Sequence, residues 1–177
     1  MTATVRILDA AGASAAVPAL ADVLVDCVHG GASVSFMAPL PAGKALAFWQ
    51  GVADGVARGE RLLLVAEDAS GIVGTVQVVL QQPDNQPHRA DVAKMLVHSR
   101  ARRQGIAGRL LAAAETAAVA AGKTVLVLDT VTGGDAERLY ARAGWQRVGE
   151  IPNYALMPDG APCSTTYFHR QLVTRSA

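Results

Sequence analysis

The sequence has few aromatic residues and few charges, and neither sign of charge dominates. Aromatic side chains are 5% of the 177 residues, and charged side chains are 18%, which is below the roughly 25% of ordinary globular chains. Lys and Arg number 16 and Asp and Glu 15, so the formal net charge is +1. This balance argues against bulk electrostatic binding of nucleic acid or of an anionic membrane. Hydrophobic residues make up 51%, which predicts a folded, mainly aliphatic core.

Cysteine and long apolar runs are also scarce. The two cysteines, Cys27 and Cys163, have no CxxC spacing, so the sequence predicts neither a disulfide framework nor a zinc site. No run of about 18 or more apolar residues is free of charges and helix breakers, which disfavours a membrane-spanning helix. Residues 1–6 lack the basic start and apolar run of a signal peptide. We therefore expect a cytoplasmic protein with two reduced, buried thiols.

Apolar spacing predicts four helices, and β-branched runs predict seven strands. The helices are expected at Ala15–Val28, with Pro18 in its first turn, and at Pro41–Arg58, Ile106–Ala121 and Asp135–Ala143. The strands are expected at Val5–Leu8, Arg61–Glu67, Ile72–Gln82, Arg89–Val97, Thr124–Asp129, Trp145–Gly149 and Thr165–Leu172. The apolar run Thr124–Asp129 is typical of a strand buried on both faces, and Asn153–Pro162 is expected to be a long loop. This order predicts one domain over residues 1–177, with an α/β fold, a mixed sheet and helices on both faces.

Residues 95–108 carry the most informative chemical pattern. A strand ends at Val97, the basic segment Ser99–Gln104 follows, and a helix begins beside Gly105. Glycine lets a ligand approach the backbone closely, and the free amides of a helix N-terminus bind anions. Three arginines, Arg100, Arg102 and Arg103, are expected to add mobile positive charge, so a diphosphate is the expected ligand. An ordinary strand-to-helix turn with solvated arginines is the alternative interpretation. The residues fit neither the P-loop nor the Rossmann dinucleotide motif.

Two segments resemble the GNAT superfamily of N-acetyltransferases. Arg102-Arg103-Gln104-Gly105-Ile106-Ala107 fits the family pattern Arg/Gln-x-x-Gly-x-Gly/Ala, and Ala136-x-x-x-Tyr140-x-x-x-Gly144-Trp145 is similar to the family segment Ala-x-x-x-Tyr-x-x-x-Gly-Phe. The order of the expected elements also matches. The resemblance implies the GNAT fold, a mixed and mostly antiparallel sheet of about six or seven strands, and acetyl-CoA as the acetyl donor.

The resemblance also implies which residues contact acetyl-CoA. The pyrophosphate is expected on the loop and first helical turn, and the pantetheine arm is expected to pair with the end of the preceding strand like an added strand. The residues implied are Leu96, Val97, Arg102, Arg103, Gln104, Gly105, Ile106, Ala107 and Gly108, with Tyr140 beside the CoA sulfur. The sequence departs from the family at Gly133, where many members have an Asn that helps to hold the cofactor.

The chain is similar over nearly its full length to a narrower group, the tabtoxin-resistance acetyltransferases. The segments that carry this similarity are His29-Gly30-Gly31-Ala32-Ser33-Val34, Leu128-Asp129-Thr130, Val148-Gly149-Glu150-Ile151-Pro152-x-Tyr154 and Met157-Pro158-Asp159-Gly160. The resemblance implies transfer of an acetyl group to the amine of a small β-lactam amino acid toxin, as self-protection or resistance. Relatives in one fold acetylate different amines, so other acceptors remain alternatives.

Acetyl transfer to an amine needs a base for the ammonium proton, a donor for the oxyanion and an acid for the departing thiolate. Tyr140 is the candidate acid, because a phenol with a pKa near 10 is protonated at neutral pH; a tyrosine packed on the core is the alternative. Asp91 and Asp129 are the candidate bases and ammonium ligands, and both border one cleft if their strands are adjacent and parallel. Alternatively, Asp129 caps the following loop and Asp91 pairs with Arg89.

Four further residues are candidates for the acceptor pocket, namely His29, Ser33, Trp49 and Tyr154, whereas His98 is expected to face solvent. No residue cluster predicts a metal, and no Ser or Cys has the context of a catalytic triad, so we expect direct transfer without an acyl-enzyme. The expected partners are a small-molecule amine and a second copy of the chain, with no nucleic acid and no membrane. Acetylation of a protein or peptide amine and a non-catalytic CoA-binding module are the alternative functions.

Overall fold

The fold is taken from a computed structural model, which describes residues 3–172. The first two and last five residues of the predicted domain, 1–177, lie outside the described residues. In chain order the elements are β1 (Thr4–Leu8), α1 (Ala10–His29), α2 (Ala42–Ala57), β2 (Arg61–Asp68), β3 (Gly71–Val79), β4 (Arg89–Val97), the short 3-10 helix η1 (Ser99–Ala101), α3 (Ile106–Ala120), β5 (Val125–Val131), α4 (Asp135–Arg142), β6 (Gln146–Leu156) and β7 (Pro162–Gln171).

Seven strands form one sheet in the order β1-β2-β3-β4-β5-β7-β6. All neighbouring strands run antiparallel except β4 and β5, which are parallel. The parallel pair needs a crossover, and α3 supplies it between the two strands. This topology confirms the predicted mixed, mostly antiparallel sheet.

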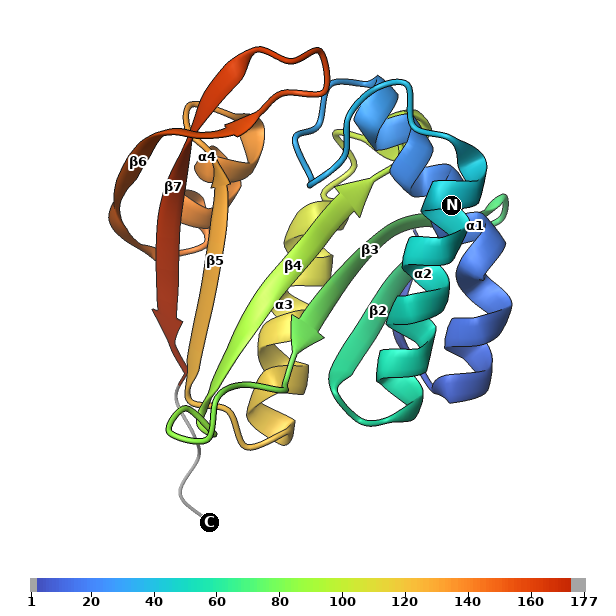
Figure 1. The fold of residues 1–177 in the computed structure, drawn as a ribbon. Helices are drawn as coiled ribbons and strands as arrows, with labels where there is room; N and C mark the ends of the chain where they lie inside the picture. The colour runs from blue at the N-terminus through green and yellow to red at the C-terminus, as the bar shows by residue number, and fades with distance from the viewer. Residues whose placement is uncertain (1–2, 173–177) are drawn as a thin grey trace.

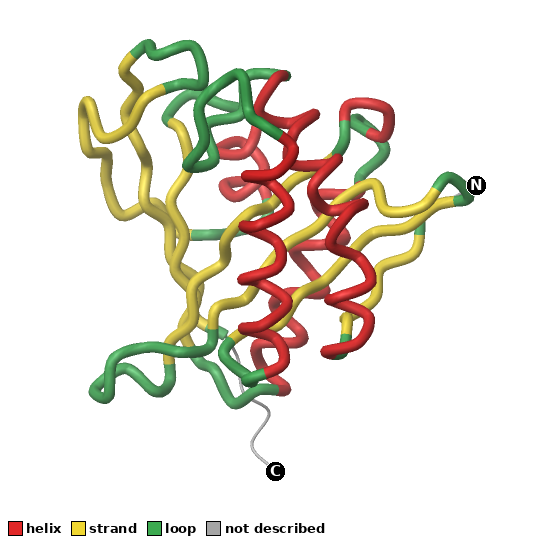
Figure 2. The backbone as a smooth tube through the Cα atoms, turned by 45° about the vertical axis from the view of Figure 1, so that its right-hand side comes forward, coloured by secondary structure: helices red, strands yellow, loops and turns green. Residues whose placement is uncertain are grey.

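Helices cover both faces of the sheet, as Figures 1 and 2 show for α1 and α2 on one face and α3 on the other. We call the face under α1 and α2 the front and the face under α3 and α4 the back. The front core contains Leu20, Leu24, Trp49, Leu63 and Val65. The back core combines α3 side chains with Tyr140 of α4, Trp145 and Phe168 of β7. Burial on both faces explains why β2 and β3 read as nearly continuous apolar runs.

Helix α1 begins five residues earlier than the spacing predicts, at Ala10 rather than Ala15, so Pro18 lies in its interior and not in its first turn. Asp9 caps this earlier start, because its carboxylate accepts a hydrogen bond of 2.7 Å from the Gly12 amide. Pro18 removes the amide that the Ser14 carbonyl would otherwise bond. Both residues are exposed, so water can solvate that carbonyl.

Two strands near the C-terminus also differ from expectation. β5 is not buried on both faces: Leu126 and Leu128 are buried in the back core, whereas Asp129 is exposed on the opposite side. β6 continues to Leu156 and β7 begins at Pro162, so half of the segment expected as a long loop is strand, and the connection between the strands is only residues 157–161. Pairing with β7 at Ala155 and Leu156 holds the end of β6 in this extended form.

Helix α1 has the length and apolarity of a membrane span, with 20 residues and a mean hydropathy of 1.6 over its most apolar window. Half of that window, 50%, is buried inside the protein. The buried side chains, such as Leu20 and Leu24, pack in the front core. The apolar character of α1 is therefore accounted for by its position as a core helix.

Trp49 and Leu46 lie on the same helix, α2, and replacing each by Ala tests how much the front core contributes to stability. Trp49 is 0% exposed, whereas Leu46 is 39% exposed. We expect Trp49→Ala to lower the free energy of unfolding by about 3–5 kcal/mol because it leaves a cavity. Leu46→Ala is the matched control and should cost less than about 1 kcal/mol. Urea unfolding followed by circular dichroism measures both, and equal losses would contradict the position of Trp49 in the core.

Candidate active site

The site is organised around a gap in the sheet between β4 and β5. These strands pair only where Arg89, Ala90 and Asp91 face Val125, Leu126 and Val127, and beyond that point they separate, as Figure 1 shows. Within residues 3–172, no strand pairs with the gap side of residues 92–97 of β4. The gap therefore exposes backbone groups to which an extended molecule could bind in the manner of an added strand.

The basic loop and the start of α3 lie at the open end of β4. Residues 102–105 are exposed, and Arg103 and Gly105 have left-handed backbone conformations, with φ of 60° and 72°. Gly105 occupies the N-cap position of α3, and no side chain caps this helix. The first turn contains no acidic residue, so its amides keep their positive character. The amides of Ile106, Ala107 and Gly108 can therefore bind an anionic group.

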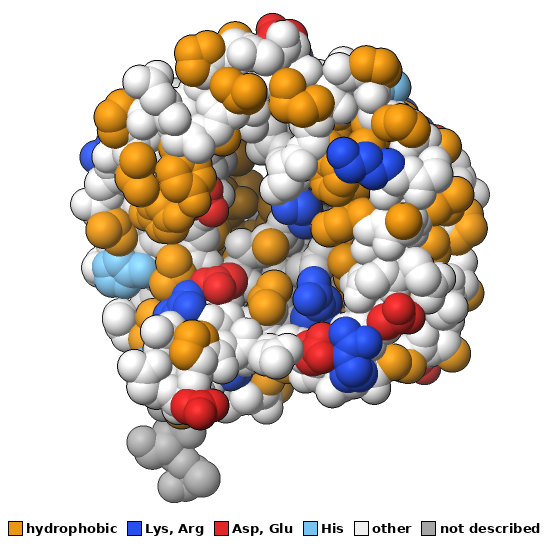
Figure 3. Space-filling view, in the orientation of Figure 1, with side chains coloured by type: hydrophobic (Ala, Val, Ile, Leu, Met, Phe, Trp, Pro, Cys, Tyr) orange, Lys and Arg blue, Asp and Glu red, His pale blue; other side chains and the backbone are white. Residues whose placement is uncertain are grey.

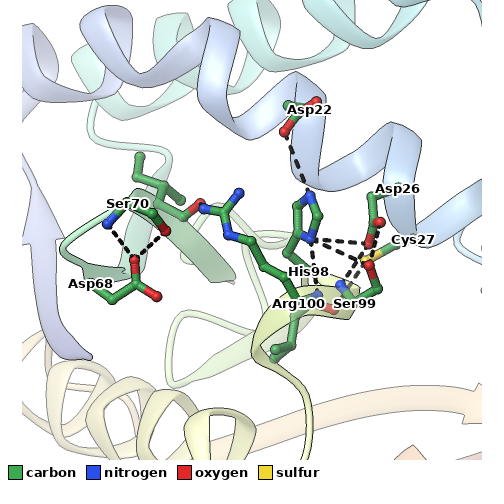
Figure 4. Close-up of polar contacts among 10 residues, drawn as sticks. Asp22, Asp26, Cys27, Asp68, Ser70, His98, Ser99 and Arg100 are labelled. Atoms are coloured by element: carbon green, nitrogen blue, oxygen red, sulfur yellow. Dashed lines mark hydrogen bonds and ion pairs between the residues drawn. The ribbon is translucent and has the colours of Figure 1, made fainter. Parts of the chain in front are cut away.

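The loop is held against α1 by a cluster of polar residues, shown in Figure 4. The Asp26 carboxylate accepts hydrogen bonds from the Ser99 amide and hydroxyl, each 2.7 Å long. His98 lies between Asp26 and Asp22, with each ring nitrogen 3.6 Å from one carboxylate, and only 15% of its side chain is exposed. The expectation that His98 faces solvent is therefore wrong. Burial favours a higher pKa for Asp26, but the Ser99 hydrogen bonds and the nearby His98 and Arg102 lower that pKa below its ordinary value.

Two of the three arginines expected to be mobile are held by backbone carbonyls. Arg100 donates to the Ile72 carbonyl at 3.2 Å, and Arg102 donates to the Val97 carbonyl at 3.3 Å. Arg103 makes no side-chain hydrogen bond or ion pair within the described residues and is exposed. The positive charge of this loop is thus partly fixed beside the end of β4.

Asp91 and Asp129 both lie on the front side of the sheet, as the predicted parallel strands require. Asp91 stands where the strands begin to separate and forms an ion pair with Arg89, and it also accepts a hydrogen bond of 3.1 Å from Gln82. Asp129 lies two residues past the paired segment and accepts a hydrogen bond of 2.9 Å from Thr165. The Arg89 pairing is the structural alternative that the sequence left open for Asp91. Of the two carboxylates, Asp129 has no arginine partner among the described residues.

Tyr140 lies on α4, on the back side of the sheet, and is 4% exposed. Its ring packs near Trp145 and Phe168, with centroids 5.9 and 6.0 Å away. Burial and the negative charge of Asp129 raise the pKa of Tyr140 far above its ordinary value. The phenol is therefore protonated throughout the physiological range, and the hydroxyl makes no hydrogen bond to another described residue.

The front side of the gap is hollowed, and Figure 3 shows acidic and basic side chains at the walls of this hollow. Two residues that the sequence did not single out belong to it. Tyr167 lies opposite Asp129 in the β5–β7 pairing, and its hydroxyl is 3.0 Å from that of Tyr154. The Tyr154 hydrogen bond, burial and Asp129 together raise the pKa of Tyr167 to about 12. Lys94 is the second residue, and its Nζ donates to Ser35 at 3.2 Å.

Three of the predicted acceptor-pocket residues make contacts that hold the surrounding structure. The His29 ring accepts a hydrogen bond of 3.0 Å from the Leu40 amide and holds the loop between α1 and α2. Ser33 donates to the Leu156 carbonyl at 2.8 Å and joins this loop to β6. Trp49 is buried in the front core. Tyr154, by contrast, is 48% exposed beside Tyr167.

Gly133 has a local structure that explains its departure from the family pattern. Its φ of 79° is a left-handed conformation, which glycine adopts without strain. Its amide donates to the Glu137 carboxylate, and its carbonyl accepts a hydrogen bond of 2.9 Å from Arg138. The turn before α4 is therefore stabilised within the chain, without an asparagine side chain.

Comparison with known families identifies the domain type. A family model for the acetyltransferase (GNAT) domain matches residues 59–147, which make up half of the chain. The matched segment runs from just before β2 into β6. It therefore contains both strands of the gap, the basic loop, α3 and α4.

Solved structures share the fold over nearly the whole chain. An N-acetyltransferase from Staphylococcus aureus Mu50 has a TM-score of 0.79 and 18% identity, over 98% of this chain and 100% of that one. A ribosomal-protein-alanine N-acetyltransferase from Brucella melitensis has a TM-score of 0.80 and 21% identity, over 96% and 99%. A phosphinothricin acetyltransferase from Sinorhizobium meliloti, in complex with acetyl-CoA, has a TM-score of 0.78 and 18% identity, over 97% and 89%. At these identities the likeness concerns the fold.

The lowered pKa of Asp26 predicts a pH-dependent contribution to stability. A lowered folded-state pKa stabilises the fold above the unfolded value of about 3.9, and this contribution disappears as the pH falls through the folded-state pKa. We expect Asp26→Asn to reduce the free energy of unfolding by about 1–3 kcal/mol at neutral pH. The loss should shrink at lower pH, where wild type also carries a neutral group. Urea unfolding over a pH series measures this.

The control is Asp22→Asn, one helical turn away, where 72% of the side chain is exposed. It should cost less than about 1 kcal/mol at every pH. If the loss of unfolding free energy in Asp26→Asn were the same at neutral and acidic pH, the charge of the Asp26 carboxylate would not be what holds the loop.

Proposed function

This chain belongs to the GNAT family of acetyltransferases, and we propose that it transfers the acetyl group of acetyl-CoA directly to the amine of a small molecule. The observation that carries this proposal is the gap between β4 and β5. An anion-binding loop lies at its open end and a hollow with carboxylates lies on its front side. Two substrates, one with a diphosphate and one with an amine, can therefore meet there.

The acetyl donor would be held by the residues that the resemblance assigns. The uncapped first turn of α3 and the exposed loop, residues 102–108, suit the pyrophosphate. Gly105 leaves open space where a side chain would stand. The gap side of Leu96 and Val97 suits the pantetheine arm, although the Val97 carbonyl already accepts hydrogen bonds from Arg102 and Cys27. Acetyl-CoA supplies the activated acyl group, and an amide of this strand end would face its carbonyl oxygen.

Asp129 is the better supported of the two candidate bases. It borders the gap beyond the point where the strands separate, whereas Asp91 is occupied by Arg89 and Gln82. A carboxylate there can bind the ammonium group of the acceptor and take its proton, directly or through water. The charge of Asp91 is offset by Arg89, so its proposed part is to border the closed end of the gap.

Tyr140 is the proposed acid for the departing CoA thiolate. Its raised pKa keeps the phenol in the protonated form, so its O–H would face the departing sulfur as a hydrogen-bond donor. Its position on the back side, with Asp129 on the front side, would put acid and base on opposite sides of the gap. Such an arrangement suits direct transfer between two bound substrates without an acyl-enzyme.

A small acceptor is supported by the closure of the front side. The loop between α1 and α2 is joined to the β6–β7 hairpin by two hydrogen bonds, Ser33 to Leu156 at 2.8 Å and Ala38 to Pro158 at 3.0 Å. An open groove for a peptide would need these two segments to stay apart. We propose a tabtoxin-like β-lactam amino acid as the acceptor, with a role in toxin resistance, because four segments of the sequence resemble the tabtoxin-resistance acetyltransferases. The neighbours from Brucella and Sinorhizobium are named for different acceptors, a ribosomal-protein alanine and phosphinothricin.

Thiol release from acetyl-CoA with tabtoxinine-β-lactam as acceptor tests the reaction and the site together. We expect rapid release by wild type, and a loss of kcat of at least about tenfold, 1.4 kcal/mol in the barrier, in Tyr140→Phe and in Asp129→Asn. Asp91→Asn is the matched carboxylate control and should lose less than Asp129→Asn. Binding of acetyl-CoA, measured by calorimetry, should survive in all three variants.

The outcomes separate the parts of this proposal. Bound acetyl-CoA without release would reject tabtoxinine-β-lactam, and a panel of other amines and peptides would follow. Failure of the whole panel would favour a non-catalytic CoA-binding module. A larger loss in Asp91→Asn than in Asp129→Asn would reverse the choice of base.

The proposal extends to the organisation of the protein. One continuous sheet supports a single N-acetyltransferase domain over residues 1–177. The two free thiols, Cys27 and Cys163, support a cytoplasmic location. Cys27 is buried as expected, whereas Cys163 is half-buried.

Four of the exposed large apolar side chains lie on the edge strand β6, namely Val148, Ile151, Tyr154 and Leu156. Such an edge supports a homodimer.

Sedimentation equilibrium tests the dimer. Val148 is 68% exposed, so Val148→Asp should leave the fold intact while placing a charge on the apolar edge. We expect wild type to sediment as a dimer and the variant as a monomer. A monomeric wild type at micromolar concentration would contradict this part of the proposal.

A further inference from the structure

Lys94 occupies an unusual position in the strand that borders the gap. The β3–β4 pairing slips between Thr75 and Gln77, so that Lys94 and Met95 together face a single residue of β3. This is a β-bulge, a feature that redirects side chains and is common beside active sites. Lys94 has a φ of 51°, a left-handed conformation that L-residues with long side chains rarely adopt. The bulge directs its side chain to the front, where it contacts Ser35 and Phe48.

The ammonium group of Lys94 has little to balance its charge. Its Nζ donates to the Ser35 hydroxyl at 3.2 Å and stands 5.7 Å from the centre of the Phe48 ring. Within the described part of the chain, no carboxylate comes within 4.0 Å of it. Burial lowers the pKa of Lys94, and the negative charge of Asp129 opposes this without forming an ion pair. A half-buried cation with one neutral hydrogen-bond partner is poorly satisfied.

The partner of Lys94 is itself held in a strained conformation. Ser35 has a φ of 77° and belongs to the loop between α1 and α2. Two non-glycine residues with left-handed backbones, Lys94 of β4 and Ser35 of the α1–α2 loop, are therefore joined by a side-chain hydrogen bond on the front side. Backbone strain of this kind persists where surrounding structure enforces it, and it is concentrated at sites that bind ligands.

We propose that Lys94 binds the carboxylate of the acceptor, and that the acceptor is therefore an amino-acid-like zwitterion whose amine lies at Asp129. This inference rests on the proposed acetyl transfer and specifies its acceptor class. Lys94 lies on β4 and Asp129 on β5, on the two sides of the gap. An acceptor with both an ammonium group and a carboxylate would pair with each of these opposite charges. A simple alkylamine would leave the Lys94 charge unpaired.

The experiment compares free amino acids with their carboxamides, which keep the amine and lose the negative charge. Thiol release from acetyl-CoA is measured with tabtoxinine-β-lactam and a panel of free amino acids, each beside its carboxamide. We expect wild type to prefer the acid by about tenfold or more in kcat/KM. Lys94→Met, which keeps the unbranched stem and removes the charged end, should abolish this preference mainly by raising KM for the acid. Lys94→Arg, which keeps the charge, should retain it.

Each alternative result has a definite meaning. Equal use of acid and carboxamide by wild type would overturn the assignment, as would a Lys94→Met variant that keeps the preference. A fall in kcat for both acceptors, with KM unchanged, would make Lys94 a proton-transfer group and also overturn it. If wild type acetylates other amines but none of these amino acids, the acceptor class is overturned while the proposed acetyl transfer stands. Circular dichroism and thermal unfolding confirm that the two variants are folded.

Discussion

The separation of β4 from β5 is the constraint on which the rest of the structure depends. Three residue pairs hold the strands together, and beyond Asp91 and Val127 they diverge. The bulge at Lys94 and Met95 bends β4 just past this point, and β7 holds β5 along its other edge from Val125 to Val131. The resulting gap leaves the facing edges of both strands unpaired beyond that point. In the proposed reaction, these two edges would border the meeting place of the acetyl donor and the acceptor.

Helix α1 braces both sides of this gap. Asp26, near its end, holds the basic loop through Ser99, and His29, its last residue, holds the following loop through the Leu40 amide. That loop in turn is joined to β6 by Ser33. The buried apolar face of α1 is anchored in the front core. Because α1 is fixed in the core, it also fixes the positions of the two segments that are proposed to contact the acetyl donor and the acceptor.

One carboxylate, Asp129, contributes to the pKa of three groups at the site. Burial raises the pKa of Tyr140, the Tyr154 hydrogen bond and burial raise that of Tyr167, and the charge of Asp129 adds to both. Burial lowers the pKa of Lys94, and the charge of Asp129 opposes this. All three effects of this charge favour the protonated form. In the proposed reaction, this charge would keep an acid protonated, hold an ammonium group and leave a cation available for the acceptor carboxylate.

Much of the fold could be predicted from sequence, because apolar periodicity and turn residues are local signals. The limits of β4 and the start of α3 agree with prediction, and the basic loop with Gly105 already indicated an anion site. The predicted start of α1 is too late, although its cap, Asp9 bonded to the Gly12 amide, is also a local signal. The strand after Asn153, by contrast, depended on a distant partner, β7. The positions of Trp49 in the core, Tyr167 beside Asp129 and Lys94 in a bulge likewise follow from strand register and packing. The local sequence therefore determined the elements and the chemical types of the candidate residues. Only tertiary structure decided which of them meet, since those contacts join residues far apart in the chain.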